Sequence, residues 1–157
     1  MKDFFVRLTI PDESSMQALG ARLAAACKGA AVIFLTGQLG SGKTTFTRGF
    51  LRGLGFHGHV KSPTYTLVES YVFGLQTVYH FDFYRVRDPL ELEYIGIEDY
   101  FDERSLCLIE WPECGHGHLP VPDLFCDIAP HPAGREVRVR SGSDRGNFIL
   151  HRFENDE

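Results

Sequence analysis

The residues with the clearest capacity for chemistry are a lysine and a threonine that close a glycine-rich run. Residues 37–44 read Gly-Gln-Leu-Gly-Ser-Gly-Lys-Thr and match the P-loop pattern G-x-x-x-x-G-K-[ST] at every fixed position. Glycines let successive backbone N–H groups face a phosphate at a helix N-terminus, where the helix dipole also favours negative charge. Lys43 is expected to bind the β- and γ-phosphates, and the Thr44 hydroxyl to bind Mg²⁺. The motif predicts a nucleoside triphosphate site with the contact residues Gly37, Leu39, Gly40, Ser41, Gly42, Lys43, Thr44 and Thr45.

The sequence on both sides of this motif has the order that a phosphate loop requires. An apolar run at 31–35 precedes it and is typical of a buried strand. Residues 45–54 follow it and place Phe46, Phe50 and Leu54 at helical spacing. The alternative is a glycine-rich turn with a solvated lysine, but the order of strand, loop and helix favours the phosphate site.

Two acidic residues are candidates for catalysis because each follows apolar residues in a strand-like segment. In residues 78–85, strand alternation places His80 and Asp82 on one face, and a carboxylate within an aromatic strand is costly to desolvate unless it is paired or near a metal. Glu110 follows the apolar run 106–109, where an acid can bind Mg²⁺ directly or through water, or orient the attacking water. An ion pair or a solvated hairpin face is the alternative for Asp82, and a helix-capping or surface role is the alternative for Glu110.

A third candidate is the polar loop 61–66, Lys-Ser-Pro-Thr-Tyr-Thr, which lies some twenty residues beyond the P-loop. P-loop hydrolases carry a switch segment in this region, and its threonine senses the γ-phosphate and Mg²⁺. Taken alone, the loop is only a turn before a strand.

These candidates must be positioned by an α/β fold. Helices are predicted between Pro11 and Gly29, after the P-loop, and from Asp88 onward. The predicted core positions of the first helix are Met16, Leu19, Leu23 and Ala26, and the third helix carries Leu90, Leu92, Tyr94 and Ile95. The predicted strands are 4–10, 31–35, 64–73, 76–84, 105–109, 124–128, 136–140 and 147–150.

The strands at 64–73 and 76–84 are separated by Gly74-Leu75 and predict an antiparallel hairpin. Such a hairpin stands where a repeated βα fold would have another helix. We therefore expect one P-loop NTPase-like α/β domain over residues 1–157, with a mixed parallel and antiparallel sheet flanked by helices.

Composition limits the classes of protein that fit this sequence. The formal net charge of −5 argues against a domain that grips nucleic acid by itself. No apolar run approaches the roughly 20 residues that span a bilayer, and the N-terminus lacks the apolar region of a signal peptide. The four cysteines form no CxxC pair, so we expect reduced thiols and a cytoplasmic protein.

Several segments together resemble the TsaE (YjeE) family of bacterial ATPases. The resemblance covers roughly residues 13–125, and its matching elements are 37–45, 61–65 (Lys-Ser-Pro-Thr-Tyr), 80–85 (His-Phe-Asp-Phe-Tyr-Arg) and 110–113 (Glu-Trp-Pro-Glu). The last two segments are far more discriminating than the P-loop. The family usually has an acid where Gln38 stands and often has alanine where Ser41 stands. Neither position supplies the lysine or hydroxyl function, so we expect at most a changed affinity.

The resemblance implies a protein that hydrolyses ATP to ADP and phosphate in the presence of Mg²⁺. It implies that this turnover supports a partner complex, TsaB and a TsaD-type transferase, that makes threonylcarbamoyladenosine beside the tRNA anticodon. By matched position, Thr64 is the switch threonine, Asp82 and Glu110 are the acids near the metal and the attacking water, and Trp111 neighbours the nucleotide. Hydrolysis is expected to be slow until a partner completes the site.

Other readings of the sequence remain to be separated by experiment. A small-metabolite kinase also begins with a P-loop, but no arginine-bearing lid segment is evident, and a nucleotide-gated assembly factor needs no catalysis. A GTPase is rejected because neither Asn147 nor Asn155 is followed by lysine. Arg135, Arg138 and Arg140 are typical of a solvated edge strand, and docking of tRNA or of an acidic partner surface is the alternative.

Overall fold

The computed structural model describes residues 5–155, whose strands form one sheet of seven in the order β1-β7-β6-β2-β5-β4-β3. The strands are β1 Phe5–Ile10, β2 Ala31–Thr36, β3 Val68–Phe73, β4 Gln76–Asp82, β5 Ser105–Glu110, β6 Leu124–His131 and β7 Gly134–Ser141. The α-helices are α1 Glu13–Cys27, α2 Lys43–Gly53, α3 Glu91–Tyr94 and α4 Asp144–Asn155, and two 3₁₀-helices are η1 Ile97–Tyr100 and η2 Pro112–Gly115.

The centre of the sheet is parallel and its margins are antiparallel. Strand β2 pairs in parallel with β5 and β6, and β4 pairs in parallel with β5. The pairs β3–β4, β6–β7 and β1–β7 are antiparallel. The expected mixed sheet and the expected hairpin are thus confirmed. Because parallel strands end at the same edge, the loops after β2, β4 and β5 meet there.

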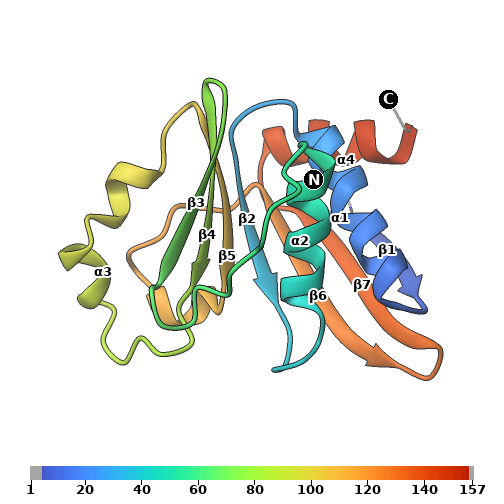
Figure 1. Cartoon of the computed structure of the whole chain (residues 1–157), viewed down its shortest axis with the longest axis horizontal. Helices are drawn as coiled ribbons and strands as arrows, with labels where there is room; N and C mark the ends of the chain where they lie inside the picture. Colours follow the sequence, from blue (N-terminus) through green and yellow to red (C-terminus); the bar gives the residue numbers. More distant parts are fainter. Residues whose placement is uncertain (1–4, 156–157) are drawn as a thin grey trace.

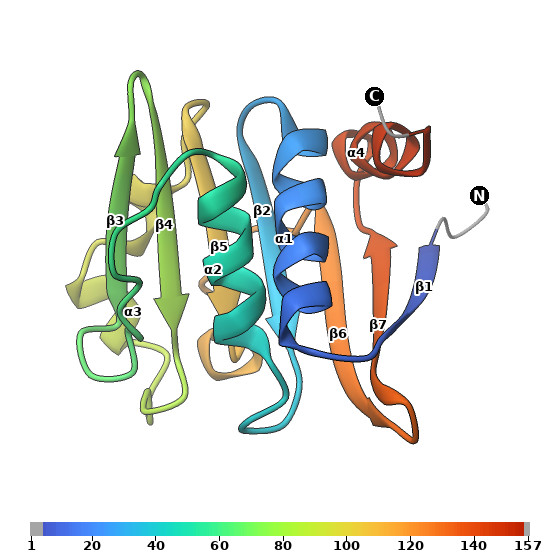
Figure 2. The same ribbon diagram turned by 45° about the vertical axis from the view of Figure 1, so that its right-hand side comes forward.

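Helices cover the sheet on both sides, with two separate cores. Figure 2 shows α1 and α2 side by side in front of the central strands, with α4 on the same side near the C-terminus. The larger core lies beneath these helices, and the expected core residues Met16, Leu19, Leu23 and Ala26 are buried in it. In Figure 1, α3 lies on the opposite side, beside β3, where a smaller core contains Phe81, Phe83 and Leu92.

The strand predicted at 147–150 is wrong, because these residues lie within α4. Four residues cannot distinguish a strand from a buried helix face, whereas the longer segment has helical spacing: Ile149, Leu150 and Phe153 are buried. The Ser143 hydroxyl accepts a hydrogen bond from the Gly146 N–H at 3.0 Å and so satisfies an amide in the first turn.

Other element boundaries also differ from the prediction, and β6 and β7 extend beyond the predicted strands 124–128 and 136–140. Residues 64–67 form a turn rather than a strand, closed by a 2.8 Å bond from the Leu67 N–H to the Pro63 carbonyl. Strand β4 ends at Asp82 because its carboxylate accepts the Tyr84 N–H at 2.9 Å, which turns the chain. The helix after Asp88 is a single turn, which buries Leu92 but leaves Tyr94 89% exposed. Phe4, the first residue of the first predicted strand, lies outside the described residues.

Strand β7 is not an edge strand, which corrects the reading of its arginines. It pairs with both β1 and β6, so the sheet ends at β1 instead. Val137 and Val139 are buried, and Arg138 and Arg140 lie on the opposite face, as strand alternation predicts. Arg138 is 3.9 Å from Glu136, and Arg140 lies 4.0 Å from the centre of the Phe125 ring.

Close packing of α1 on α2 fixes the helix that begins at the phosphate loop. A Cβ added at Gly49 of α2 would lie 2.1 Å from the Gln17 carbonyl oxygen of α1. We expect Gly49→Ala to lower the free energy of unfolding by about 2 kcal/mol or more, because backbone must separate from backbone. Urea unfolding measures the change, with Arg48→Ala, a half-buried neighbour on the same helix, as control. A stability equal to that of the parent would contradict this packing.

Among residues 5–155, no helix is long and apolar enough to cross a bilayer.

Candidate functional site

The loop from Gly37 to Gly42 connects β2 to α2 and has a conformation that requires glycine. Gly42, which precedes the first turn of α2, has φ of 114°, a region that other residues rarely adopt. A Cβ at Gly37 would lie 2.6 Å from both the Ile128 carbonyl oxygen and the Ser41 hydroxyl. The loop therefore wraps tightly in front of the N-terminus of α2, where backbone N–H groups and the helix dipole favour an anion.

Lys43 is the first residue of α2, and its side chain lies in a cleft rather than in solvent. The residue is only 5% exposed, its Nζ donates a 2.5 Å hydrogen bond to the Gly37 carbonyl, and Nζ lies 4.0 Å from the centre of the Trp111 ring. Burial lowers the pKa of Lys43, while the nearby carboxylates of Glu110 and Asp82 oppose that shift. The positively charged ammonium of Lys43 thus lies at the N-terminus of α2, near two carboxylates.

The two acids lie opposite each other at the ends of neighbouring parallel strands. Asp82 ends β4, Glu110 ends β5, and the two are register partners. They are 6% and 3% exposed. Burial raises the pKa of Asp82 and Glu110 adds to the increase, whereas the Tyr84 N–H and the Thr64 hydroxyl counteract it. A cation beside these strand ends would therefore stabilise the ionised form of Asp82.

Thr64 reaches this edge from the turn before β3. Its hydroxyl donates a 3.2 Å hydrogen bond to Asp82 Oδ2 and lies 2.7 Å from the Ser62 hydroxyl. The Leu67 carbonyl also accepts the Asp82 N–H at 3.1 Å, so the turn is attached to the end of β4. Ser62 was missed as a site residue, although it stands in the same loop motif.

These side chains surround one open pocket of about 230 Å³. Every residue expected to bind nucleotide or metal or to act in catalysis lines it except Gly37, which contacts it through the Lys43 hydrogen bond. The lining residues are Leu39, Gly40, Ser41, Gly42, Lys43, Thr44, Thr45, Ser62, Thr64, Asp82, Glu110 and Trp111.

Trp111 has an unusual backbone conformation that directs its ring to this pocket. Its φ of 56° is in the left-handed region, which is uncommon for a tryptophan. The indole packs against Tyr84, with ring centres 5.0 Å apart, and faces the Lys43 ammonium on the pocket side. Uncommon backbone of this kind persists where the surrounding structure enforces it, often at functional sites.

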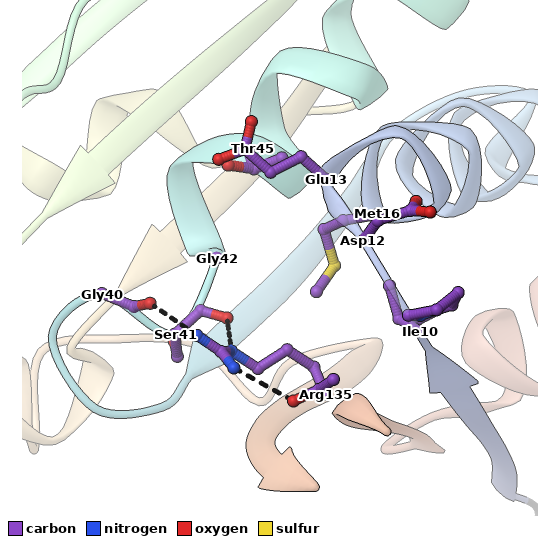
Figure 3. A pocket seen from close by; sticks show the side chains of 11 residues that line it. Ile10, Asp12, Glu13, Met16, Gly40, Ser41, Gly42, Thr45 and Arg135 are labelled. Carbon is purple, nitrogen blue, oxygen red and sulfur yellow. Dashed lines mark hydrogen bonds between the residues drawn. The ribbon is translucent and has the colours of Figure 1, made fainter. Parts of the chain in front are cut away.

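A second pocket of about 240 Å³ adjoins the same loop. Figure 3 shows Arg135, from β7, reaching the outer side of the loop between Gly40 and Ser41. Its guanidinium donates to the Ser41 carbonyl at 3.1 Å and to the Gly40 carbonyl at 3.4 Å. Ile10, Met16 and Thr45 line the same pocket. No pattern in the sequence indicates this role, because Arg135 is more than 90 residues away from the loop.

Sequence reasoning also missed the partner of Glu110. His80 is fully buried, and its Nε2 lies 2.5 Å from Glu110 Oε2. The available signal was strand alternation, which placed His80 on the same face as Asp82.

The described residues contain no cluster of three or more His, Cys, Asp or Glu side chains that could hold a metal ion. The side chains at this pocket that could offer oxygen ligands to a cation are Thr44, Asp82 and Glu110. That ligand set fits Mg²⁺, which binds few carboxylates and keeps several waters.

Comparison with known proteins identifies a family. A model described as "Threonylcarbamoyl adenosine biosynthesis protein TsaE" matches residues 10–137. The tRNA threonylcarbamoyladenosine biosynthesis protein TsaE of Haemophilus influenzae is 46% identical in an alignment of 151 residues that covers 93% of this chain and 96% of that relative. The Bacillus subtilis protein of the same description is 41% identical over 94% of this chain and 89% of its own length. The crystal structure of Bacillus subtilis YdiB is similar with a TM-score of 0.79 and 29% identity, over 99% of this chain and 96% of that chain.

Proposed function

The chain belongs to the TsaE family, and from this we propose that it is a P-loop ATPase of a single domain that acts in threonylcarbamoyladenosine synthesis. It hydrolyses ATP to ADP and phosphate and thereby supports a partner complex, TsaB and a TsaD-type transferase, that modifies the adenosine beside the tRNA anticodon. The observation that carries this proposal is the single pocket into which Lys43, Thr44, Thr64, Asp82 and Glu110 converge.

Each group at the pocket has a distinct task in phosphoryl transfer. The loop backbone and Lys43 bind the β- and γ-phosphates, since the helix N-terminus and the ammonium both attract anions. Thr44, Asp82 and Glu110 would hold Mg²⁺ directly or through water, and such an ion would supply positive charge beside the phosphates. Of the two acids, one also orients the attacking water. Thr64 is the residue that would sense the γ-phosphate, since its hydroxyl lies in the pocket, where it donates to Asp82.

We expect the second pocket to bind the base of the nucleotide. It shares Gly40, Ser41, Gly42 and Thr45 with the phosphate pocket, so a ligand bound along the loop extends from one into the other. Ile10 and Met16 offer apolar surface for a ring, and Arg135 holds the carbonyl oxygens of the loop outward. The two pockets together fit a ligand with a polyanionic end and a planar end.

We expect hydrolysis by the isolated chain to be slow, because two side chains of the site are hydrogen-bonded within the chain. Lys43 is bound to the Gly37 carbonyl, and Thr64 is bound to Asp82. Both bonds must be exchanged for contacts with phosphate and metal before the site is complete. A partner that stabilises the rearranged loops therefore raises the rate without adding a chemical group.

Phosphate release by the purified chain tests this function, first alone and then with TsaB, the TsaD-type transferase and tRNA. We expect slow release alone and a clear increase with the partner proteins. Background release in every combination, with ATP binding intact, would instead indicate a nucleotide-gated assembly factor. A phosphorylated small molecule among the products would indicate a kinase.

Trp111 provides a direct signal of nucleotide binding. It is the single tryptophan of the chain, and the Lys43 ammonium lies 4.0 Å from the centre of its ring. Because Lys43 must leave the Gly37 carbonyl to bind phosphate, we expect ATP and ADP to change the indole fluorescence. Non-hydrolysable ATP analogues and ADP should give different signals, since ADP lacks the γ-phosphate that holds the Thr64 turn.

Calorimetry of the same samples establishes saturation, and Trp111→Phe is the control that removes the signal. Unchanged emission at confirmed saturation would mean that the nucleotide binds away from Trp111.

A further inference from the structure

We propose that His80 is a positioning residue that fixes the Glu110 carboxylate for phosphoryl transfer, a role that rests on the proposed ATPase function. His80 lies two residues before Asp82 on β4, and Glu110 ends the neighbouring strand β5. The imidazole Nε2 is 2.5 Å from Glu110 Oε2. The side chains of His80 and Glu110 are 0% and 5% exposed, so water does not compete for this bond.

The contact with the Glu110 carboxylate indicates which ring nitrogen of His80 is the donor. A carboxylate only accepts hydrogen bonds, so Nε2 must be the donor to Glu110. The Nδ1 of His80 has no hydrogen-bond partner within residues 5–155. The bond with His80 thus fixes one carboxylate oxygen of Glu110. The other oxygen remains available to groups in the pocket that Glu110 lines.

A purely structural role would be served better by an apolar residue. The neighbouring positions on the same side of β4 and β5 are Val78, Leu106 and Leu108, all buried in the larger core. A buried polar pair is costly to desolvate, and well-packed apolar residues of similar volume are often at least as stabilising. What the imidazole adds is a fixed direction for a carboxylate, as the outer partners of metal-binding groups do in other proteins.

The test compares two substitutions that differ in one hydrogen bond. His80→Leu removes the donor, whereas His80→Gln keeps an N–H close to the position of Nε2. We expect His80→Leu to lower kcat for ATP hydrolysis by about 10-fold or more, with KM and the Kd for ADP nearly unchanged. His80→Gln should recover most of the rate. Val78→Ala, a buried change on the same strand at a position paired with Leu106 rather than with Glu110, is the matched control and should keep the parent kcat.

A double-mutant cycle with Glu110 separates positioning from general destabilisation. If His80 acts through Glu110, His80→Leu should have little further effect on kcat in the Glu110→Gln background. Equal losses in both backgrounds, or a parent rate in His80→Leu, would overturn the proposal. Should His80→Leu fail to fold, His80→Asn replaces it, because its shorter amide does not reach Oε2. Equal rates in His80→Asn and His80→Gln would then overturn the proposal. Absence of ATP turnover in the parent chain with its partners would refute the ATPase function itself, which is a separate outcome.

Discussion

Replacing Lys43 with alanine is expected to weaken ATP binding by about 100-fold or more. Loss of a buried, hydrogen-bonded charge partner commonly costs about 2–5 kcal/mol, and 1.4 kcal/mol corresponds to a factor of ten in Kd. Lys43 is 5% exposed and stands at the N-terminus of α2 beside the glycine loop. The ammonium also balances the charge that phosphates bring next to Asp82 and Glu110.

Isothermal titration calorimetry with ATP and ADP measures this effect. Arg52→Ala is the control, because it removes a positive charge from the exposed far end of the same helix and should bind nucleotide as the parent does. Thr44→Ala should reduce mainly the part of the affinity that depends on Mg²⁺. If Lys43→Ala binds ATP as tightly as the parent, the phosphates do not lie at this loop.

Neutralising either acid at the strand ends is expected to separate catalysis from binding. Asp82→Asn and Glu110→Gln keep the side-chain shape but remove the charge that holds Mg²⁺ or orients water. We expect each to lower the rate of ATP hydrolysis by about 100-fold or more, which is about 2.7 kcal/mol of barrier, and to change ADP affinity much less. Phosphate release and calorimetry on the same samples distinguish the two quantities.

Asp82→Asn is also expected to affect the thermal stability of the fold. Burial raises the pKa of Asp82, so the folded chain binds a proton at this site more tightly than the unfolded chain does. The ionised carboxylate therefore destabilises the fold, and this penalty grows as pH rises from the ordinary pKa of Asp through the raised one. At neutral pH we expect Asp82→Asn to melt no lower than the parent.

Asp99→Asn, on the exposed part of η1, is the matched control for both measurements. Near-normal hydrolysis by Asp82→Asn and by Glu110→Gln would return both acids to a structural role.

The sequence by itself determined those features whose geometry is local. The strand, glycine loop and helix of residues 31–53 follow from contiguous residues, because backbone dihedrals and helical periodicity act over a few positions. The first helix and its core face followed for the same reason. The family motifs supplied Thr64, Asp82, Glu110 and Trp111 as candidates, but the spacing along the chain gave no distances between them.

Only the tertiary structure decided which distant residues meet. Parallel pairing of β4 with β5 places Asp82 opposite Glu110 and brings His80 within hydrogen-bonding distance of the same carboxylate. The position of β7 allows Arg135 to bind the carbonyl oxygens of the glycine loop. Strand order and register depend on the packing of the whole chain, which leaves no signature in a short window of sequence. The same reason explains residues 147–150, whose helical state depends on burial of the full length of α4.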